Sequence, residues 1–132
     1  MSAPSVALSD QDGQIRGGGA QGWFVGDRRA IAMFELDVVD GAVVPVGSGH
    51  DDVAAASFHA VIRQSGASRH DSTLRLRRNR RVSPTTLIER VDITNHGDDI
   101  GNLVLLFWIA SDFAGVDSVK ASRVVSLVRA TV

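Results

Sequence analysis

Apolar and polar residues alternate with a period of two in several separate segments of this chain. Successive side chains of a β-strand point to opposite faces, so a strand with one buried face shows this alternation. The alternating segments are Phe34–Val38, Phe58–Arg63, Leu74–Arg77 and Arg90–Thr94. Ala30–Leu36 and Asp51–Phe58 could each form a helical turn or two, but neither keeps a helical spacing of apolar residues. The alternation therefore predicts a fold built of strands.

Residues typical of turns separate these segments at intervals of about 8 to 12 residues, the spacing expected of an antiparallel sandwich or barrel. Asp40-Gly41 suits the positive backbone angles of a tight hairpin turn, so we expect Ala42–Val46 to return as a strand. Pro45 favours an edge or a strand end because it has no backbone N–H. The chain has 132 residues, 44% of them hydrophobic, which suffices for one domain spanning 1–132. The expected fold class is all-β, an antiparallel β-sandwich.

The segment Leu103–Ile109 departs from the alternation because its residues are apolar on both faces. A strand with this composition is covered on both sides. In a sandwich, one face would meet the second sheet, and the other would need a helix, a loop or a partner domain. This segment is therefore a candidate contact surface, with Trp108 as its largest side chain.

Two motifs suggest ligand sites but lack the context that such sites require. Gly17–Gly22 formally matches the dinucleotide-binding pattern G-x-G-x-x-G, which works only between a buried strand and a helix. No convincing helix follows it, so we interpret it as a turning loop. His50–Asp52 and His70-Asp71 place imidazoles beside carboxylates, but adjacent strand residues point to opposite faces and cannot chelate together. We interpret both as surface turns and expect no metal and no cofactor.

No residue is marked as catalytic. The chain contains no cysteine, which excludes a cysteine nucleophile and thiolate metal ligands. Glycoside hydrolysis needs two carboxyl groups, and the available acids are Asp98, Asp99, Asp112 and Asp117. No sequence feature marks any of them as lying in an apolar pocket that would raise its pKa.

Five arginines form the strongest charge cluster: Arg75, Arg77, Arg78, Arg80 and Arg81. Such a cluster can bind nucleic acid or an acidic partner. We do not expect nucleic acid, because aromatic residues for base stacking are missing nearby and 15 acidic residues balance 14 basic ones. The arginines belong to both sides of the expected strand, so a solvated or ion-paired strand is the alternative interpretation.

An ordered set of segments resembles one known family. An aromatic pair followed by Asp-x-Arg occurs in Gly22–Arg29, and the acidic strand Phe34–Gly41 follows. A basic strand then leads into Glu-Arg-x-x-Ile-Thr-Asn-x-Gly-Asp, an apolar strand and Asp-Phe-Ala, within Leu74–Ala114. Over about residues 12–120, this set is similar to the N-terminal domain of bacterial glycogen debranching enzymes and amylo-alpha-1,6-glucosidase-like proteins.

The resemblance implies a supersandwich-like domain that precedes a helical toroid, which carries the catalytic carboxylates in that family. The chain is then expected to be a non-catalytic accessory domain that packs against the toroid glucosidase domain, in cis or in trans, with weak contact to an α-glucan. We expect the sandwich to be incomplete at its C-terminal end. Because an unpaired strand edge recruits other chains, we also expect a homo-oligomer. The alternative function is a stand-alone module that binds an acidic partner through the arginine-rich strand.

Six residues are candidates for a substrate or domain-interface surface, and none of them is assigned a catalytic role. Trp23, Asp27 and Arg29 match the aromatic and Asp-x-Arg pattern, and Asp112 and Phe113 form a comparable pair near the other end. Trp108 belongs to the two-sided apolar strand. Residues 1–10 lack the features of a secretory signal, and no apolar run approaches the roughly 18 residues of a membrane helix. We therefore expect a cytoplasmic protein without membrane contact.

Overall fold

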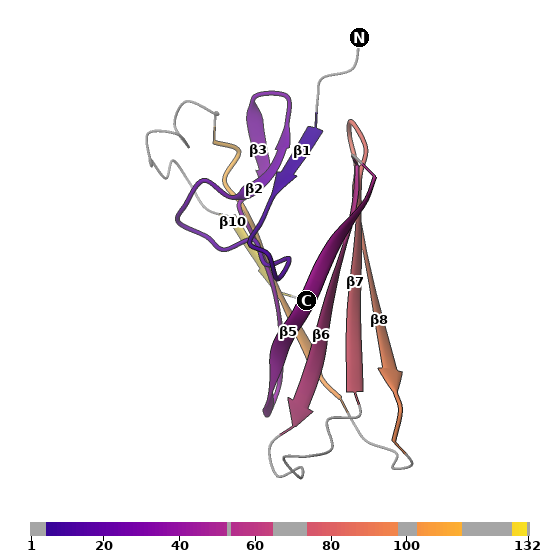
Figure 1. Cartoon of the computed structure of the whole chain (residues 1–132). Coiled ribbons are helices and arrows are strands. Elements are labelled where there is room, and N and C mark those ends of the chain that lie inside the picture. The colour runs from indigo at the N-terminus through magenta and orange to yellow at the C-terminus, as the bar shows by residue number, and fades with distance from the viewer. Residues whose placement is uncertain (1–4, 53, 65–73, 98–102, 115–127, 132) are drawn as a thin grey trace.

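The computed structural model describes residues 5–52, 54–64, 74–97, 103–114 and 128–131 of the chain. All regular structure in these ranges is β-strand, and every pair of neighbouring strands is antiparallel. The expected all-β antiparallel sandwich is thus confirmed (Figure 1). The strands are β1 (Ser5–Leu8), β2 (Gly22–Val25), β3 (Arg28–Ile31), β4 (Met33–Val38), β5 (Gly41–Asp52), β6 (Ala55–Gln64), β7 (Leu74–Val82), β8 (Leu87–Asn95), β9 (Leu105–Ser111) and β10 (Val128–Thr131).

The strands form three sheets. The largest has the order β5-β6-β7-β8, the second the order β10-β9-β4, and the smallest the order β1-β2-β3. Figure 1 shows β5–β8 as one layer, with the β1-β2-β3 sheet at the end of the molecule where the N-terminus lies. In the described ranges, no helix is long and apolar enough to cross a membrane.

The core lies between the two larger sheets. Leu36 and Val38 of β4 pack there with Ile62 of β6 and Leu76 of β7, and all four side chains are buried. Phe107 of β9 packs against them from beside β4. The alternating residues that the sequence pattern singled out therefore supply the inner faces of the sandwich, as half-buried strands require.

The Asp40-Gly41 turn is present, but the expected hairpin pairing is wrong. Asp40 has a positive φ of 55°, as the turn requires. The strands on either side do not pair with each other, since β4 pairs with β9 and β5 pairs with β6. The turn instead carries the chain from one sheet to the other. A Cβ at Gly41 would lie 2.5 Å from the carbonyl oxygen of Arg63, so this crossing requires glycine.

Other local expectations have mixed outcomes. Ala42–Val46 is a strand, and it extends to residue 52 as an edge strand with a bulge beside Pro45. The suggested helical turns are wrong, because Ala30–Leu36 lies mainly in β3 and β4, and Asp51–Phe58 lies mainly in β5 and β6. Pairing with neighbouring strands satisfies the backbone of both segments, which a short isolated helical turn would not do.

The edge of β4 that faces away from β9 is covered by the segment before β2. Phe34 exchanges two backbone hydrogen bonds with Ile15, at 2.8 and 3.0 Å. The side-chain amide of Gln14 then continues the pairing, because it accepts from Leu36 N at 2.9 Å and donates to Leu36 O at 2.8 Å. An edge whose polar groups are satisfied in this way does not invite another strand.

Candidate functional site

The arginine-rich strand β7 divides its charges between two faces. Arg78 and Arg80 continue the inward face that begins with Leu76, and only 2% and 3% of these arginines are exposed. Their placement on both faces was expected, but their burial was not predicted. The signal was present in the sequence, because the alternation of Leu74 and Leu76 continues to both positions. The outward, exposed arginines are Arg75, Arg77 and Arg81.

Glu89 of β8 joins the two buried guanidinium groups. Its Oε1 accepts from Arg78 Nε at 2.7 Å and from Arg80 Nη2 at 3.1 Å, and its Oε2 accepts from Arg80 Nε at 2.7 Å. The side chain of Glu89 is only 6% exposed. The register of β7 and β8 places Arg80 directly opposite Glu89, so strand pairing assembles the cluster. One carboxylate here balances two guanidinium groups.

Aromatic rings line the remaining faces of this buried cluster. The Arg78 guanidinium carbon lies 5.3 Å from the Phe34 ring centre, and that of Arg80 lies 5.1 Å from the Phe58 ring centre. These are cation–π distances. In the described part of the chain, Arg78 Nη2 and Arg80 Nη1 have no hydrogen-bond partner. Burial lowers the pKa of Arg78, and Arg80 adds to this, although Glu89 opposes both effects.

The cluster also holds the segment before β2 against the larger sheet. Arg78 Nη1 donates to Gln14 Oε1 at 2.7 Å, and Arg80 Nη2 donates to the carbonyl oxygen of Gly13 at 2.8 Å. Gly13 has a φ of +87°, and a Cβ there would lie 2.7 Å from the Phe58 ring. Glycine is therefore required at this position. Because Gln14 also bonds β4, the segment connects both sheets of the sandwich.

A second buried ion pair joins β3 to the end of β9. Arg29 Nε donates to Asp112 Oδ1 at 3.1 Å, and Arg29 Nη2 forms an ion pair with Asp112 Oδ2. Arg29 Nη1 also donates to the carbonyl oxygens of Gly19 and Gln21, at 2.7 and 3.2 Å. Burial alone would raise the pKa of Asp112, but the hydrogen bond and charge of Arg29 and the backbone N–H of Ala114 hold it below its ordinary value.

The structure brings together two of the six residues predicted from sequence. Arg29 and Asp112 are paired and buried, so their charged groups are not available to a ligand. Trp23 is half-buried and donates its indole N–H to Ser5 Oγ at 2.6 Å. The other three do not join them: Asp27 is exposed in the turn between β2 and β3, Phe113 is 62% exposed after β9, and Trp108 is 43% exposed on β9.

The two apolar faces of β9 differ in their surroundings. Leu105 and Phe107 pack against the core, as expected for the inner face. On the outer face, Trp108 lies opposite Glu35 of β4 in the register. Just before the strand, Val104 is 55% exposed. Within the described residues, the second face of this apolar strand therefore remains partly open to solvent.

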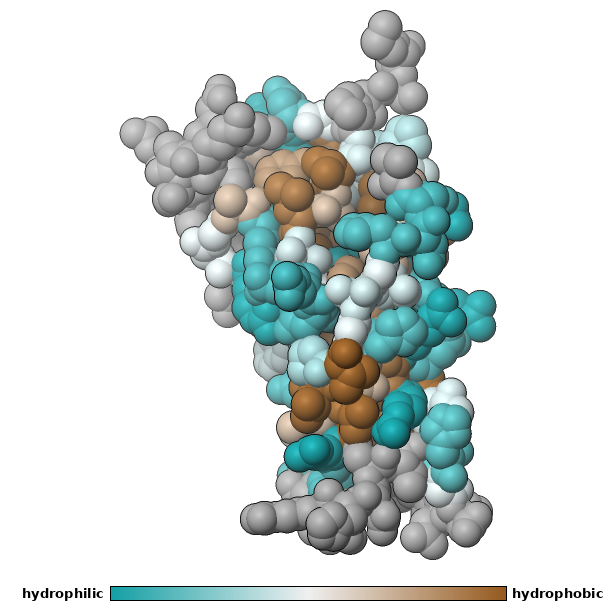
Figure 2. Space-filling model, viewed as in Figure 1, coloured by the Kyte–Doolittle hydropathy of each residue, from teal (hydrophilic) through white to brown (hydrophobic). Residues whose placement is uncertain are grey.

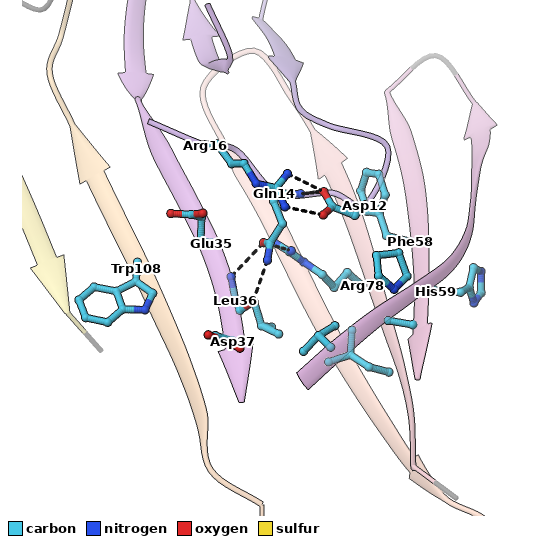
Figure 3. Close-up of a pocket in the computed structure, with 14 residues that line it drawn as sticks. Asp12, Gln14, Arg16, Glu35, Leu36, Asp37, Phe58, His59, Arg78 and Trp108 are labelled. Carbon is cyan, nitrogen blue, oxygen red and sulfur yellow. Dashed lines mark hydrogen bonds and ion pairs between the residues drawn. The ribbon is translucent and has the colours of Figure 1, made fainter. Parts of the chain in front are cut away.

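A pocket of about 470 Å³ adjoins the edge of β4 (Figure 3). Figure 3 shows Glu35 and Trp108 on one side of β4 and Asp12, Gln14 and Arg78 on the other, so the lining wraps around this strand. The pocket is lined by Asp12, Gln14, Arg16, Glu35, Leu36, Asp37, Val43, Pro45, Phe58, His59, Ala60, Leu76, Arg78 and Trp108.

An exposed ion-pair network forms the rim of this pocket near the N-terminal segment. Arg16 Nη2 lies 2.7 Å from Asp12 Oδ2, and its Nη1 is paired with Asp10. These hydrogen bonds raise the pKa of Arg16. Burial would raise the pKa of Asp12, but Arg16, the backbone N–H of Gln14 and the charge of Arg78 together lower it. Both groups therefore remain charged at neutral pH.

The glycine motif and one of the two His-Asp motifs lie within the described residues, and neither forms a ligand site there. Gly17–Gly22 forms a loop that leads into strand β2, so the strand-to-helix context of a dinucleotide site is absent there. His50–Asp52 lies exposed at the end of β5. The described part of the chain contains no group of three metal-ligating side chains. His70-Asp71, Asp98-Asp99 and Asp117 lie outside the described residues.

Comparison with protein families identifies a match over almost the whole chain. Residues 1–131 match the model of a family described as the N-terminal domain of (some) glycogen debranching enzymes. No curated protein and no solved structure matches the chain significantly.

Proposed function

The chain belongs to the family of N-terminal domains of glycogen debranching enzymes, and from this membership we propose that it is a non-catalytic accessory domain. In this proposal, residues 1–132 form a single domain that packs against the helical catalytic domain of a debranching enzyme. It supports the shape of that domain and leaves the hydrolysis to it.

The outer face of β9 is the observation that carries the proposal. Trp108 and Val104 are 43% and 55% exposed, although they belong to the most apolar segment of the chain. Exposed apolar side chains on one strand face are typical of a surface that a partner covers. Tryptophan is also one of the residue types enriched among the interface residues whose truncation costs about 2 kcal/mol or more.

Two carboxyl groups, those of Asp12 and Asp112, support a non-catalytic role. A general acid of a glycosidase needs a raised pKa, which an apolar site provides. Asp12 and Asp112 have the opposite environment, since their arginine partners lower the pKa of both groups. They are therefore suited to holding the fold together and not to donating a proton at neutral pH.

Binding of an isolated debranching-enzyme catalytic domain, supplied in trans, tests the proposal by sedimentation velocity. We expect the wild-type chain to co-sediment with that domain and Trp108→Glu to lose at least 90% of the complex. Ile88→Glu is the matched control, because Ile88 is an exposed apolar residue (58%) on β8 of the other sheet. Full binding by Trp108→Glu would contradict the proposed interface. The same measurement on the chain alone reports whether a second copy covers this face.

A second candidate function rests on the outer face of the β5-β6-β7-β8 sheet. Although the chain has a net charge of −1, exposed arginines gather on this face, and two of them, Arg81 and Arg90, form exposed ion pairs with Asp52 and Asp92. Figure 2 shows hydrophilic surface where β7 and β8 lie in Figure 1. Such a face suits an acidic protein partner, since guanidinium groups bind carboxylates in paired hydrogen bonds. The arginines are Arg63, Arg75, Arg77, Arg81 and Arg90.

Binding to poly-glutamate at two salt concentrations tests this second candidate. We expect the affinity to fall with salt and to drop at least tenfold in the double variant Arg75→Glu/Arg77→Glu. Arg28→Glu is the control, because Arg28 is exposed on the β1-β2-β3 sheet. Equal loss in the control would mean that net charge, and not this face, determines binding.

A further inference from the structure

The edge of the β5-β6-β7-β8 sheet at β8 carries an inference that goes beyond the proposed function. We infer that β8 pairs antiparallel with β8 of a second copy of this chain. The two four-stranded sheets then join into one continuous sheet across a two-fold axis at Val91. The charges on β8 itself point to this partner, because they complement those of a second, antiparallel β8.

The edge of β8 has the features that strand pairing requires. The strand has nine residues, and all nine pair with β7 without a register shift. Within the ranges that the structure describes, no strand pairs with its other side, and Figure 1 shows β8 at the margin of the sheet. A long and regular edge strand presents a row of backbone N–H and C=O groups that can pair with another chain.

The opposite edge of the same sheet is protected against such pairing. That edge is β5, which contains Pro45, a residue without a backbone N–H. The register of β5 with β6 shifts beside Pro45 and again between His50 and Asp52. Proline and bulges are among the features by which natural sheets keep an edge from pairing. Of the two edges of this sheet, β8 is therefore the one suited to a second strand.

The charges of β8 complement those of a second, antiparallel β8. When Val91 lies opposite Val91, Arg90 of each copy lies opposite Asp92 of the other copy. Both side chains are on the outer face, 75% and 40% exposed, and within one strand Arg90 Nε already lies 3.0 Å from Asp92 Oδ1. In the dimer, four charges of alternating sign surround the axis. Opposite charges in directly facing positions stabilise an antiparallel pair.

The same charges disfavour the neighbouring registers. Side chains alternate between faces, so a continuous sheet must pair outward residues with outward residues. Moving the axis by one residue keeps this condition but places either Arg90 opposite Arg90 or Asp92 opposite Asp92. Like charges in directly facing positions are destabilising. The order of charges along β8 therefore selects the register with its axis at Val91.

The inner face of β8 offers apolar surface to the second copy. Val91 and Ile93 pack against the core but are only partly buried. In the selected register, Val91 meets its own counterpart at the axis, and Ile93 lies opposite Glu89. A charge that points inward from an edge strand often prevents pairing. Glu89 does not, because it is already bound to Arg78 and Arg80 and is only 6% exposed.

Sedimentation equilibrium of the chain alone tests the dimer. We expect the mass to rise with concentration from 14.0 kDa toward twice that value. Arg90→Asp and Asp92→Arg each place like charges across the axis, so each should weaken dimerisation at least tenfold. Arg28→Asp makes the same change at an exposed position of the β1-β2-β3 sheet and should dimerise like the wild type.

Two results of this experiment would overturn the inference. One is a monomeric mass of the wild type up to about 1 mM, which would mean a dissociation constant above that value. The other is unchanged dimerisation in both Arg90→Asp and Asp92→Arg. Loss of the dimer in Trp108→Glu instead would place the second copy on β9 and would also overturn it.

Restored charge complementarity separates an effect on the interface from an effect on folding. The double variant Arg90→Asp/Asp92→Arg again places opposite charges across the axis, so it should dimerise like the wild type. An equimolar mixture of the two single variants should form a heterodimer, because each copy then carries charges of one sign at these positions. If neither the double variant nor the mixture dimerises, the inference is overturned.

A single cysteine reports the register directly, because the chain contains no other. Directly opposite Cα atoms of an antiparallel pair lie about 4.5–5.5 Å apart, within the reach of a disulfide. Val91→Cys should therefore form a covalent dimer on mild oxidation, seen on a non-reducing gel. Ile93→Cys is the matched control, since its two thiols would be separated by four residue positions, roughly 13 Å. Equal cross-linking of both variants, or none of Val91→Cys, would overturn the inference.

Discussion

Replacement of Glu89 by glutamine removes the one carboxylate that joins two buried guanidinium groups. Glu89 accepts three hydrogen bonds of 2.7 to 3.1 Å from Arg78 and Arg80, and all three side chains are at most 6% exposed. Loss of one member of a buried ion pair costs about 3–5 kcal/mol, because the remaining charge stays buried without compensation. Domains of this kind have a total free energy of unfolding of about 5–15 kcal/mol. Glu89→Gln should therefore remove a large part of the stability.

Urea unfolding followed by tryptophan fluorescence and far-UV circular dichroism measures this loss. We expect a lower urea midpoint with an unchanged slope, and a decrease in Tm of roughly 10–20 °C. Glu35→Gln is the matched control, since this carboxylate is partly exposed and forms no ion pair in the described part of the chain. Its free energy of unfolding should change by no more than about 0.5 kcal/mol.

A triple replacement separates the effect of charge burial from that of lost packing. If Arg78→Met and Arg80→Met accompany Glu89→Leu, no charge stays buried, and apolar side chains fill a similar volume. We expect this variant to recover most of the stability that Glu89→Gln loses. A loss below about 1 kcal/mol in Glu89→Gln would refute the reasoning. So would a triple variant that is less stable than the single variant.

Two further predictions concern other contacts of the sandwich. Because the folded-state pKa of Asp112 is below its unfolded value of about 3.9, its pairing with Arg29 stabilises the fold above that pH, and this contribution is lost as pH falls through the folded pKa. The difference in unfolding free energy between wild type and Asp112→Asn should be constant above about pH 5 and should narrow below about pH 4; a constant difference down to pH 2 would contradict this assignment. Gly13→Ala should cost about 1–3 kcal/mol in urea unfolding, because its Cβ would lie 2.7 Å from the Phe58 ring and its φ is +87°. Gly18→Ala, also at a φ of +87° but in open space, is the control, and an equal loss there would attribute the effect to backbone strain alone.

The strands of the sandwich were largely predictable from the sequence because strand geometry is local. Alternation in Phe34–Val38 and Phe58–Arg63 indicated strands, and the inner residues Leu36 and Ile62 are indeed buried in the core. The turn at Asp40 was predictable for the same reason, since its backbone angles depend on two residues. The pairing of the strands on either side of the turn was not predictable, because turn chemistry does not determine whether the next strand joins the same sheet or the opposite one.

The candidate surface was predictable only in part. The apolar residues on both faces of β9 predicted a face that needs a covering segment or partner, and Trp108 lies partly exposed on that face. The pocket at β4 gave no signal in the sequence, because its lining comes from several strands and from the segment around Gln14. These residues meet only when the two larger sheets face each other.

The sequence by itself determined which side chains share a face of each strand, because that depends only on the period of two. Only the tertiary structure decided which partners the buried charges have. Arg29 and Asp112 lie 83 positions apart, and Arg80 meets Glu89 only through the pairing of β7 with β8. A prediction from sequence normally places a charged residue in solvent when its partner is unknown, because burial of an unpaired charge is costly. The long-range contacts supply those partners, and with them the buried arginines become part of the fold.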